Sequence, residues 1–250
     1  MSEIQSVKRA FTILKTVAGY PYGITLAELT PKVDLPKSTV ARMLSTLETI
    51  EAIERAPDGN GFRLGPETTA LALQPHYLIT ALRPYLEQLA EATGETVALV
   101  LPDNNQIHYV DQIESRYNIQ MRDFTGYRIS VLHAHSPGKL MLADKSAKQL
   151  ADYLSQPLEQ FTPQTLVDPT FLKQQIDNVR QQGYAIACDE SEPGLVGIAA
   201  PLHNQARQLL AIINIYGPAF RFPPIEPDSE LITLLLDTAR KISSDLYRVS

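Results

Sequence analysis

Residues 1–66 contain three stretches with helical periodicity followed by a predicted hairpin, and this order limits the fold more than any other feature of the chain. The first stretch has apolar residues at steps of three and four and ends at residues 19–21, which predicts an amphipathic helix. In the second, Thr25 and Glu28 have the spacing of a capping box, in which the hydroxyl and the carboxylate each bond a free backbone amide. The third begins at Pro36, because a proline costs nothing in a first helical turn. The apolar residues predicted to be buried are Ile4, Val7, Phe11, Leu14 and Ala18 in the first helix and Val40, Met43, Leu44, Leu47 and Ile50 in the third.

Two short strand-like runs follow, at residues 52–55 and 62–65, on either side of the turn Pro57-Asp58-Gly59-Asn60-Gly61. Glycine and asparagine tolerate the positive φ angles that tight hairpins need. A short helix closely followed by one with a small polar outer face is typical of the helix-turn-helix motif, and the hairpin after it is then a wing. The sequence therefore predicts a winged helix-turn-helix domain over residues 1–66.

The rest of the chain is predicted to be a helical linker and a second domain. Pro66 breaks the first pattern, and residues 67–93 read as helical with interruptions at Pro75 and Pro84. The remainder, residues 94–250, alternates between strand and helix patterns. Strands are predicted at 96–101, 106–113, 118–122, 184–188, 196–202 and 208–216, and helices at 137–143, 147–154, 169–182 and 229–247. This order predicts an α+β domain with one sheet flanked by helices.

Composition excludes several classes of protein. Hydrophobic residues make up 44% of the chain and charged residues 20%, which is typical of a globular protein and not of a disordered or fibrous one. No stretch approaches the roughly 18 consecutive apolar residues of a membrane span, and the first residues lack the apolar core of a signal peptide. A single cysteine, Cys188, excludes an intrachain disulfide and a thiolate zinc site. We therefore expect a cytoplasmic protein without membrane contacts, structural metal or cofactor.

The net charge of −6 is distributed unevenly. Residues 1–66 hold eight Lys or Arg and seven Asp or Glu, a net charge of +1, whereas residues 67–250 hold fourteen and twenty-one, a net charge of −7. A phosphate backbone would repel the acidic part. Only a locally basic face of the N-terminal domain is therefore expected to bind nucleic acid.

Several motifs, in order along essentially the whole chain, resemble those of the IclR (isocitrate lyase regulator) family of bacterial transcription factors. Residues 35–44 with Leu47, and the wing that ends at residues 62–66, resemble its DNA-binding domain. The motifs that resemble its effector-binding domain are Leu132-His133-Ala134 with Gly138-Lys139, Gly183-Tyr184-Ala185, Pro193-Gly194, Ile198-Ala199-Ala200-Pro201 and Gly217-Pro218. The resemblance implies a winged helix-turn-helix domain, a helical linker and a GAF-like effector-binding domain. It also implies a non-enzymatic, ligand-responsive regulator that binds a palindromic operator as a dimer or tetramer.

The polar face of the third predicted helix is the candidate DNA-binding surface. It carries Lys37, Ser38, Thr39 and Arg42. In a groove, Arg can pair with guanine through two hydrogen bonds, and Ser or Thr can reach phosphates or base edges. From the residues alone a solvated helix face is the favoured interpretation, and the resemblance shifts it to DNA contact. Arg63 in the wing is a further candidate phosphate contact. One helix contacts too few bases to find a single site in a genome, so two copies on one duplex are expected.

The predicted helix that begins at Ser136-Pro137-Gly138-Lys139 is one candidate part of an effector pocket. Free backbone amides and the helix dipole favour a carboxylate or another anion at such a helix start. A well-capped helix explains the same residues equally well. A phosphate-binding loop is excluded, because that motif needs a glycine where this chain has His133 and a hydroxyl where it has Leu140.

The resemblance supplies the other pocket positions. The family commonly has an acidic pair after Gly-Tyr-Ala, a cysteine before Ile-Ala-Ala-Pro, and two small polar residues before the final Gly-Pro. These positions here hold Ala187 and Cys188, with Asp189 and Glu190 following, then Gly197, then Asn214 and Tyr216. Residues 214 and 216 alternate along a strand and so point to one side of the sheet. An amide and a phenol there favour an aromatic or amide-bearing effector, although core roles for both residues stay open.

Two other functions remain open from the residues alone. The first is an enzyme that turns over a small molecule in the α+β domain, although no paired carboxylates, triad or phosphate loop supports it. The second is a winged domain that binds a protein instead of DNA. His133 and His135 could hold a metal with Cys188 or Asp189, but a structural histidine is favoured because zinc-ligand spacing is absent. Nothing in the spacing places a base or an orienting group beside Cys188.

Overall fold

The computed structural model describes residues 4–20, 22–56, 59–72, 75–204, 207–222 and 229–248. The chain divides into two compact units, one of residues 1–78 with 246–250 and one of residues 79–245. Pro21, Pro57 and Asp58, which the sequence places in turns, lie outside the described residues.

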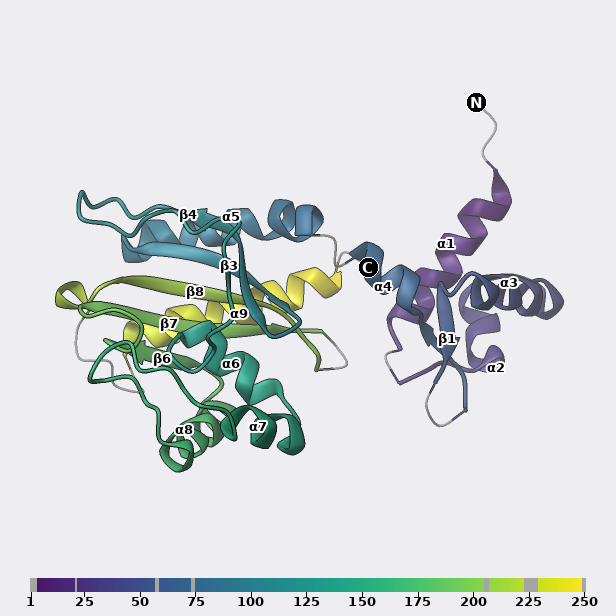
Figure 1. Ribbon diagram of the computed structural model, residues 1–250. Helices are drawn as coiled ribbons and strands as arrows, with labels where there is room; N and C mark the ends of the chain where they lie inside the picture. Colours follow the sequence, from purple (N-terminus) through teal and green to yellow (C-terminus); the bar gives the residue numbers. More distant parts are fainter. Residues whose placement is uncertain are drawn as a thin grey trace. The chain divides into compact units, whose positions relative to one another are not determined.

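In the N-terminal unit the element order is the predicted one. The elements are α1 (Gln5–Ala18), α2 (Leu26–Leu29), the 3-10 helix η1 (Thr30–Lys32), α3 (Lys37–Thr49), β1 (Ile53–Arg55), β2 (Phe62–Leu64) and α4 (Pro66–Ala72) (Figure 1). The predicted capping box is present, because the Thr25 hydroxyl accepts the Glu28 amide at 3.3 Å and the Glu28 carboxylate accepts the Thr25 amide at 2.9 Å. β1 and β2 pair antiparallel, with Ile53 opposite Leu64. The predicted winged helix-turn-helix fold is confirmed.

The buried face predicted for α1 is wrong in its first half. Ile13 and Val17 are fully buried in the core of this unit. Because successive helix residues are about 100° apart, Phe11 lies nearly opposite Ile13 on the helix. The apolar residues that were predicted to be buried and are exposed are Ile4 just before α1, Val7 and Phe11 in α1, and Ile50 just after α3. Two apolar rows therefore run along α1, and the core takes the one that contains Ile13.

Prolines begin the two linker helices. Pro66 is the first residue of α4 and Pro75 the first of α5 (Pro75–Thr93), where a proline loses no helical hydrogen bond. Pro84 lies inside α5, so the interruption predicted there is wrong. Leu82 and Leu86 on either side of it are buried, and this packing outweighs the local cost of a proline.

The second unit contains one six-stranded antiparallel sheet with the strand order β5-β4-β3-β8-β7-β6. Its strands are β3 (Thr96–Asp103), β4 (Gln106–Ile113), β5 (Arg128–Ile129), β6 (Ala185–Cys188), β7 (Leu195–His203) and β8 (Leu209–Pro218). Its helices besides α5 are α6 (Ser136–Asp144), α7 (Ala147–Leu154), α8 (Pro169–Gln182), the 3-10 helix η2 (Ala219–Arg221) and α9 (Glu230–Arg248). The predicted α+β domain is confirmed.

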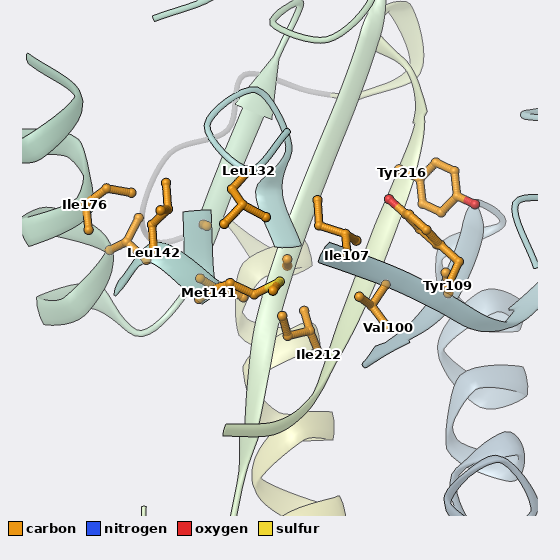
Figure 2. Packing of buried hydrophobic residues seen from close by; sticks show 14 of the residues in the cluster. Val100, Ile107, Tyr109, Leu132, Met141, Leu142, Ile176, Ile212 and Tyr216 are labelled. Atoms are coloured by element: carbon orange, nitrogen blue, oxygen red, sulfur yellow. The ribbon is translucent and has the colours of Figure 1, made fainter. Parts of the chain in front are cut away.

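The helices α6 and α8 close the core on one face of this sheet. Figure 2 shows Met141 of α6 beside Ile107 and Ile212 of the sheet, with Ile176 of α8 behind α6. On the other face, α5 contacts β4 through an ion pair between Arg83 and Asp111, at 2.6 Å. No helix formed by the described residues is long and apolar enough to cross a membrane.

The strand predicted at residues 118–122 is wrong, and the chain from residue 114 to residue 127 belongs to no strand. The edge of β4 that such a strand would use is taken by later residues. The Gly126 amide donates to the Tyr109 carbonyl at 2.8 Å, and the Tyr109 amide donates to the Tyr127 carbonyl at 3.0 Å. β5 then continues this pairing, with Ile129 opposite Ile107. Residues 114–127 are therefore a long connection between β4 and β5.

Candidate functional site

A cavity of about 40 Å³ lies between the sheet and the start of α6. Five of the nine predicted effector contacts line it: Ser136, Pro137, Gly197, Asn214 and Tyr216. Ala187, which the resemblance places at a pocket position, lines it as well. The sequence prediction did not assign the other lining residues, which are Tyr109, Phe124, Ile129, His135, Ser191 and Leu195. Alternation along β4 would have indicated Tyr109, whereas Phe124 and Ser191 come from connections whose path the sequence does not reveal.

The other four predicted contacts, Gly138, Lys139, Cys188 and Asp189, do not line the cavity. Gly138 allows α6 to approach the preceding chain, because a Cβ there would lie 2.1 Å from the Leu132 carbonyl oxygen. The Lys139 side chain is fully buried, and its ammonium group donates to the Ile186 carbonyl at 3.1 Å and to the Glu190 carboxylate. The Lys139 charge is therefore committed inside the domain.

A buried hydrogen-bond network forms the polar side of the cavity. The Ser136 hydroxyl donates to Asn214 Oδ1 at 3.0 Å. Gly197 makes this contact possible, because a Cβ at that position would lie 2.7 Å from Ser136 Oγ. Burial raises the pKa of the Tyr109 phenol, and a hydrogen bond with Asn214 partly offsets the effect. The network therefore presents neutral donors and acceptors and no buried charge.

Three aromatic rings form the other side of the cavity. The ring centroids of Tyr109 and Phe124 are 5.6 Å apart, and the Tyr216 ring is 6.3 Å from the first and 6.2 Å from the second. Figure 2 shows Tyr109 and Tyr216 close together at one end of the apolar cluster. The Tyr216 hydroxyl donates to Gln112 Oε1, so the phenol is already paired inside the domain. Burial raises the pKa of this phenol as well.

Among the titratable groups that line the cavity, His135 has the pKa closest to physiological pH. Burial, together with the nearby His133 and Lys139, lowers the pKa of its imidazole to about 4. Among the described residues the His135 ring has no hydrogen-bond partner. The imidazole is therefore neutral near pH 7 and offers one donor and one acceptor.

We expect this histidine to make the protein sensitive to acid. In the unfolded chain it binds a proton as the pH falls through about 6.5, but in the folded chain only near 4, so its contribution to stability is lost progressively between these values. Urea unfolding at a series of pH values should show that acid lowers the free energy of unfolding by roughly 2–3 kcal/mol more in the natural chain than in His135→Asn. The same pH dependence in both proteins would contradict a half-buried His135 that stays neutral in the folded chain.

His133 and Cys188 do not line the cavity. His133 is buried, and its Nδ1 and Nε2 atoms lie 2.9 Å from the Tyr153 hydroxyl and the Glu159 carbonyl, so the structural interpretation of this residue fits the geometry. Burial and the neighbouring Asp189 raise the pKa of the Cys188 thiol, which disfavours a nucleophilic thiolate. Within the described part of the chain, no three His, Cys, Asp or Glu residues are grouped to hold a metal ion.

The candidate DNA-facing residues lie on the outer face of α3 and in the wing. Lys37, Ser38 and Arg42 are exposed, and Thr39 is half-buried. Within the described residues the Arg42 guanidinium has no hydrogen-bond or ion-pair partner. Arg63 forms an ion pair with Glu54 of β1, at 2.7 Å, so a phosphate would have to compete with this carboxylate. Arg42 is therefore available to bind DNA, whereas Arg63 is paired with a carboxylate.

Comparison with known proteins decides the family. Residues 70–244 match the family described as bacterial transcriptional regulator IclR C-terminal, and residues 6–57 match the IclR helix-turn-helix domain. The chain belongs to the IclR family. This confirms the resemblance seen in the sequence, and the chain is a transcriptional regulator of that family.

Relatives of this IclR-family regulator match it along nearly its full length. The HTH-type transcriptional regulator BhcR of Paracoccus denitrificans is 32% identical over 244 residues, which cover 96% of this chain and 86% of BhcR. The crystal structure of IclR from Thermotoga maritima is similar with a TM-score of 0.63 and 26% identity, over 98% of this chain and 100% of that one. An IclR homologue from Microbacterium hydrocarbonoxydans, in complex with 4-hydroxybenzoate, has the same TM-score and coverage at 25% identity.

Proposed function

We propose that this IclR-family regulator binds a palindromic operator through α3 of two copies, and that a small organic effector in the cavity changes its DNA affinity. Residues 1–66 are the DNA-binding domain, 67–93 the linker and 94–250 a GAF-like effector-binding domain. The proposal rests on the observation that a candidate DNA-binding helix and a candidate effector cavity lie in different units of the chain. An exposed polar helix with an unpaired Arg42 lies in one unit, and a cavity with a buried polar network lies in the other.

The walls of the cavity support an aromatic or amide-bearing effector. Tyr109 and Tyr216 offer ring faces for stacking, and aromatic rings prefer offset or edge-to-face geometry. Ser136 and Asn214 would bind the polar end of the molecule, in place of their present bond to each other. The homologue crystallised with 4-hydroxybenzoate supports an effector with a ring and a polar end.

The apolar row on α1 supports self-association of the DNA-binding domain. Ile4, Val7 and Phe11 are exposed at helical spacing, and no core in their own unit covers them. A contiguous exposed apolar surface is typical of an interaction site. A dimer through this row would give the two recognition helices that a palindromic operator requires.

The test of DNA binding is the substitution Arg42→Ala. We expect it to weaken binding to an operator, selected from random duplexes by the intact chain, by roughly 1–3 kcal/mol, which is the contribution of one good base contact. The fold should be unchanged, because Arg42 is exposed and opposite the buried Leu44 row. Fluorescence anisotropy at fixed salt provides the measurement.

The matched control is Arg240→Ala, which removes an exposed arginine of α9. Its one ion-pair partner among the described residues is Asp237 of the same helix, at 2.8 Å. It should leave operator affinity unchanged within error. If Arg42→Ala and Arg240→Ala have the same effect, α3 does not contact bases and the proposed recognition helix is wrong.

A further inference from the structure

Phe124 is an aromatic residue of the cavity wall that does not belong to a strand of the sheet. Tyr109 and Tyr216 lie in β4 and β8, where each is fixed by ladder pairing on both sides. Phe124 lies in the connection of residues 114–127, which belongs to no strand. It is therefore the ring that can leave the cavity without breaking the sheet.

The connection is fixed at its two ends. At the first end, the Ser115 hydroxyl donates to the Gly94 carbonyl at 2.7 Å, and the Arg116 amide donates to the same oxygen at 3.3 Å. At the other end, the Gly126 amide donates to the Tyr109 carbonyl at 2.8 Å. Gly126 has a φ of 86°, and a Cβ there would meet nothing within 4 Å, so conformation and not space demands a glycine. The name lid is used below for residues 116–125, which run from the first anchor to the residue before Gly126.

Two side chains from the domain hold the lid between its ends. Arg221 donates to the Ile119 carbonyl at 2.8 Å. Gln112 makes two contacts, because its Oε1 accepts the Phe124 amide at 3.1 Å and its Nε2 donates to the Arg122 carbonyl at 3.4 Å. The same Oε1 accepts the Tyr216 hydroxyl. One buried amide therefore joins the lid backbone to the wall of the cavity.

The described conformation is closed to an organic molecule. The cavity of about 40 Å³ compares with a volume of about 150 Å³ for an apolar cavity that holds benzene. The Phe124 ring occupies part of the missing space, since it contacts both Tyr109 and Tyr216. A ring-bearing effector needs this space.

We propose that residues 116–125 are a lid over the cavity and that Gln112 is the positioning residue that keeps it closed. The inference rests on the proposed function of the cavity as an effector site. An effector that takes the place of the Phe124 ring and bonds the Tyr216 hydroxyl releases Gln112 from Tyr216 and from the lid together. The free energy of opening is thereby subtracted from the affinity for the effector.

The position of the lid also relates it to the linker. Its first anchor, the Gly94 carbonyl, directly follows α5. The α5 helix begins at Pro75, within the segment that leads from the DNA-binding domain. The lid is therefore anchored next to the C-terminal end of the helix that follows the DNA-binding domain in the chain.

The test is amide hydrogen exchange of the full-length chain without any effector, in Gln112→Leu and in the natural sequence. Loss of both Gln112 contacts should speed exchange of the lid amides, including that of Phe124, by about ten-fold. The amides of β3 and β8 should keep their protection and serve as the internal reference. The matched control is Gln106→Leu at the start of the same strand, where the glutamine side chain has no hydrogen bond among the described residues, and it should leave the lid unchanged.

Lid exchange in Gln112→Leu within two-fold of the natural chain would overturn the proposal, as would the same increase in Gln106→Leu. If Gln112→Leu does not fold, Tyr216→Phe tests the proposal instead. This change removes the hydroxyl that, together with the Phe124 amide, donates to Gln112 Oε1. Lid exchange in Tyr216→Phe should then rise by about three-fold, and no rise would overturn the proposal. These measurements are made without effector, so they test the lid alone. A failure of the lid proposal can therefore be told apart from a failure of the proposed effector site.

Discussion

Replacing Lys139 by alanine should lower the free energy of unfolding by roughly 3–5 kcal/mol, which is the typical cost of removing one partner from a buried ion pair. The Lys139 side chain is 0% exposed, and the side chain of its partner Glu190 is 8% exposed. Burial lowers the pKa of the Lys139 ammonium, and Glu190 opposes this shift. Glu190 Oε2 already has no hydrogen-bond partner, so loss of the lysine would leave an isolated buried carboxylate.

Urea unfolding of the intact chain measures this effect, with Lys148→Ala as the control. Lys148 is exposed on α7, and its loss should change stability by less than about 0.5 kcal/mol. The double variant Lys139→Met with Glu190→Gln should recover most of the lost stability, because no charge is then buried alone. Equal stabilities of Lys139→Ala and Lys148→Ala would show that the pair does not support the fold.

Placing a charge in the apolar row of α1 should lower operator affinity by about 100-fold or more. The change is Phe11→Asp. Linking two binding units raises the overall affinity by factors of about 10²–10⁴, and a chain that can no longer dimerise loses this gain. Phe11 is 60% exposed, so the substitution leaves the core of its own unit intact. Analytical ultracentrifugation and operator binding, measured on the same samples, test the prediction.

Phe171→Asp is the matched control, because Phe171 is 61% exposed on α8 of the other unit. This variant should keep both the oligomeric state and the operator affinity of the natural chain. A Phe11→Asp protein that stays a dimer with unchanged affinity would show that the α1 row is not an interface.

Local signals in the sequence predicted most elements, because local chemistry decides them. The capping box placed the start of α2, and the helix pattern over residues 147–154 gave the bounds of α7. The predicted strand at residues 106–113 has the bounds of β4. In each case the residues that define the element also form its caps or its buried face.

The errors arise where distant parts of the chain compete for the same position. Both apolar rows of α1 have helical period, and only the packing of the other helices selects the row with Ile13. Residues 118–122 have a strand-like composition, but residues 126–129 already occupy the edge of β4. The cavity combines Tyr109, Phe124 and Ser136, which are adjacent only after the sheet has formed. Periodicity carries no information about such contacts.

The central claim is that occupation of the cavity and binding of the operator are coupled. Calorimetric titration tests it, with an effector found by thermal-shift screening added to the chain in the presence and absence of operator duplex. Linkage requires that the effector affinity changes between the two states by the same factor by which the effector changes operator affinity. We predict a factor of about 5–150 in the natural chain, and greatly weakened effector binding in Asn214→Ala. Equal effector affinities with and without the operator would contradict the account.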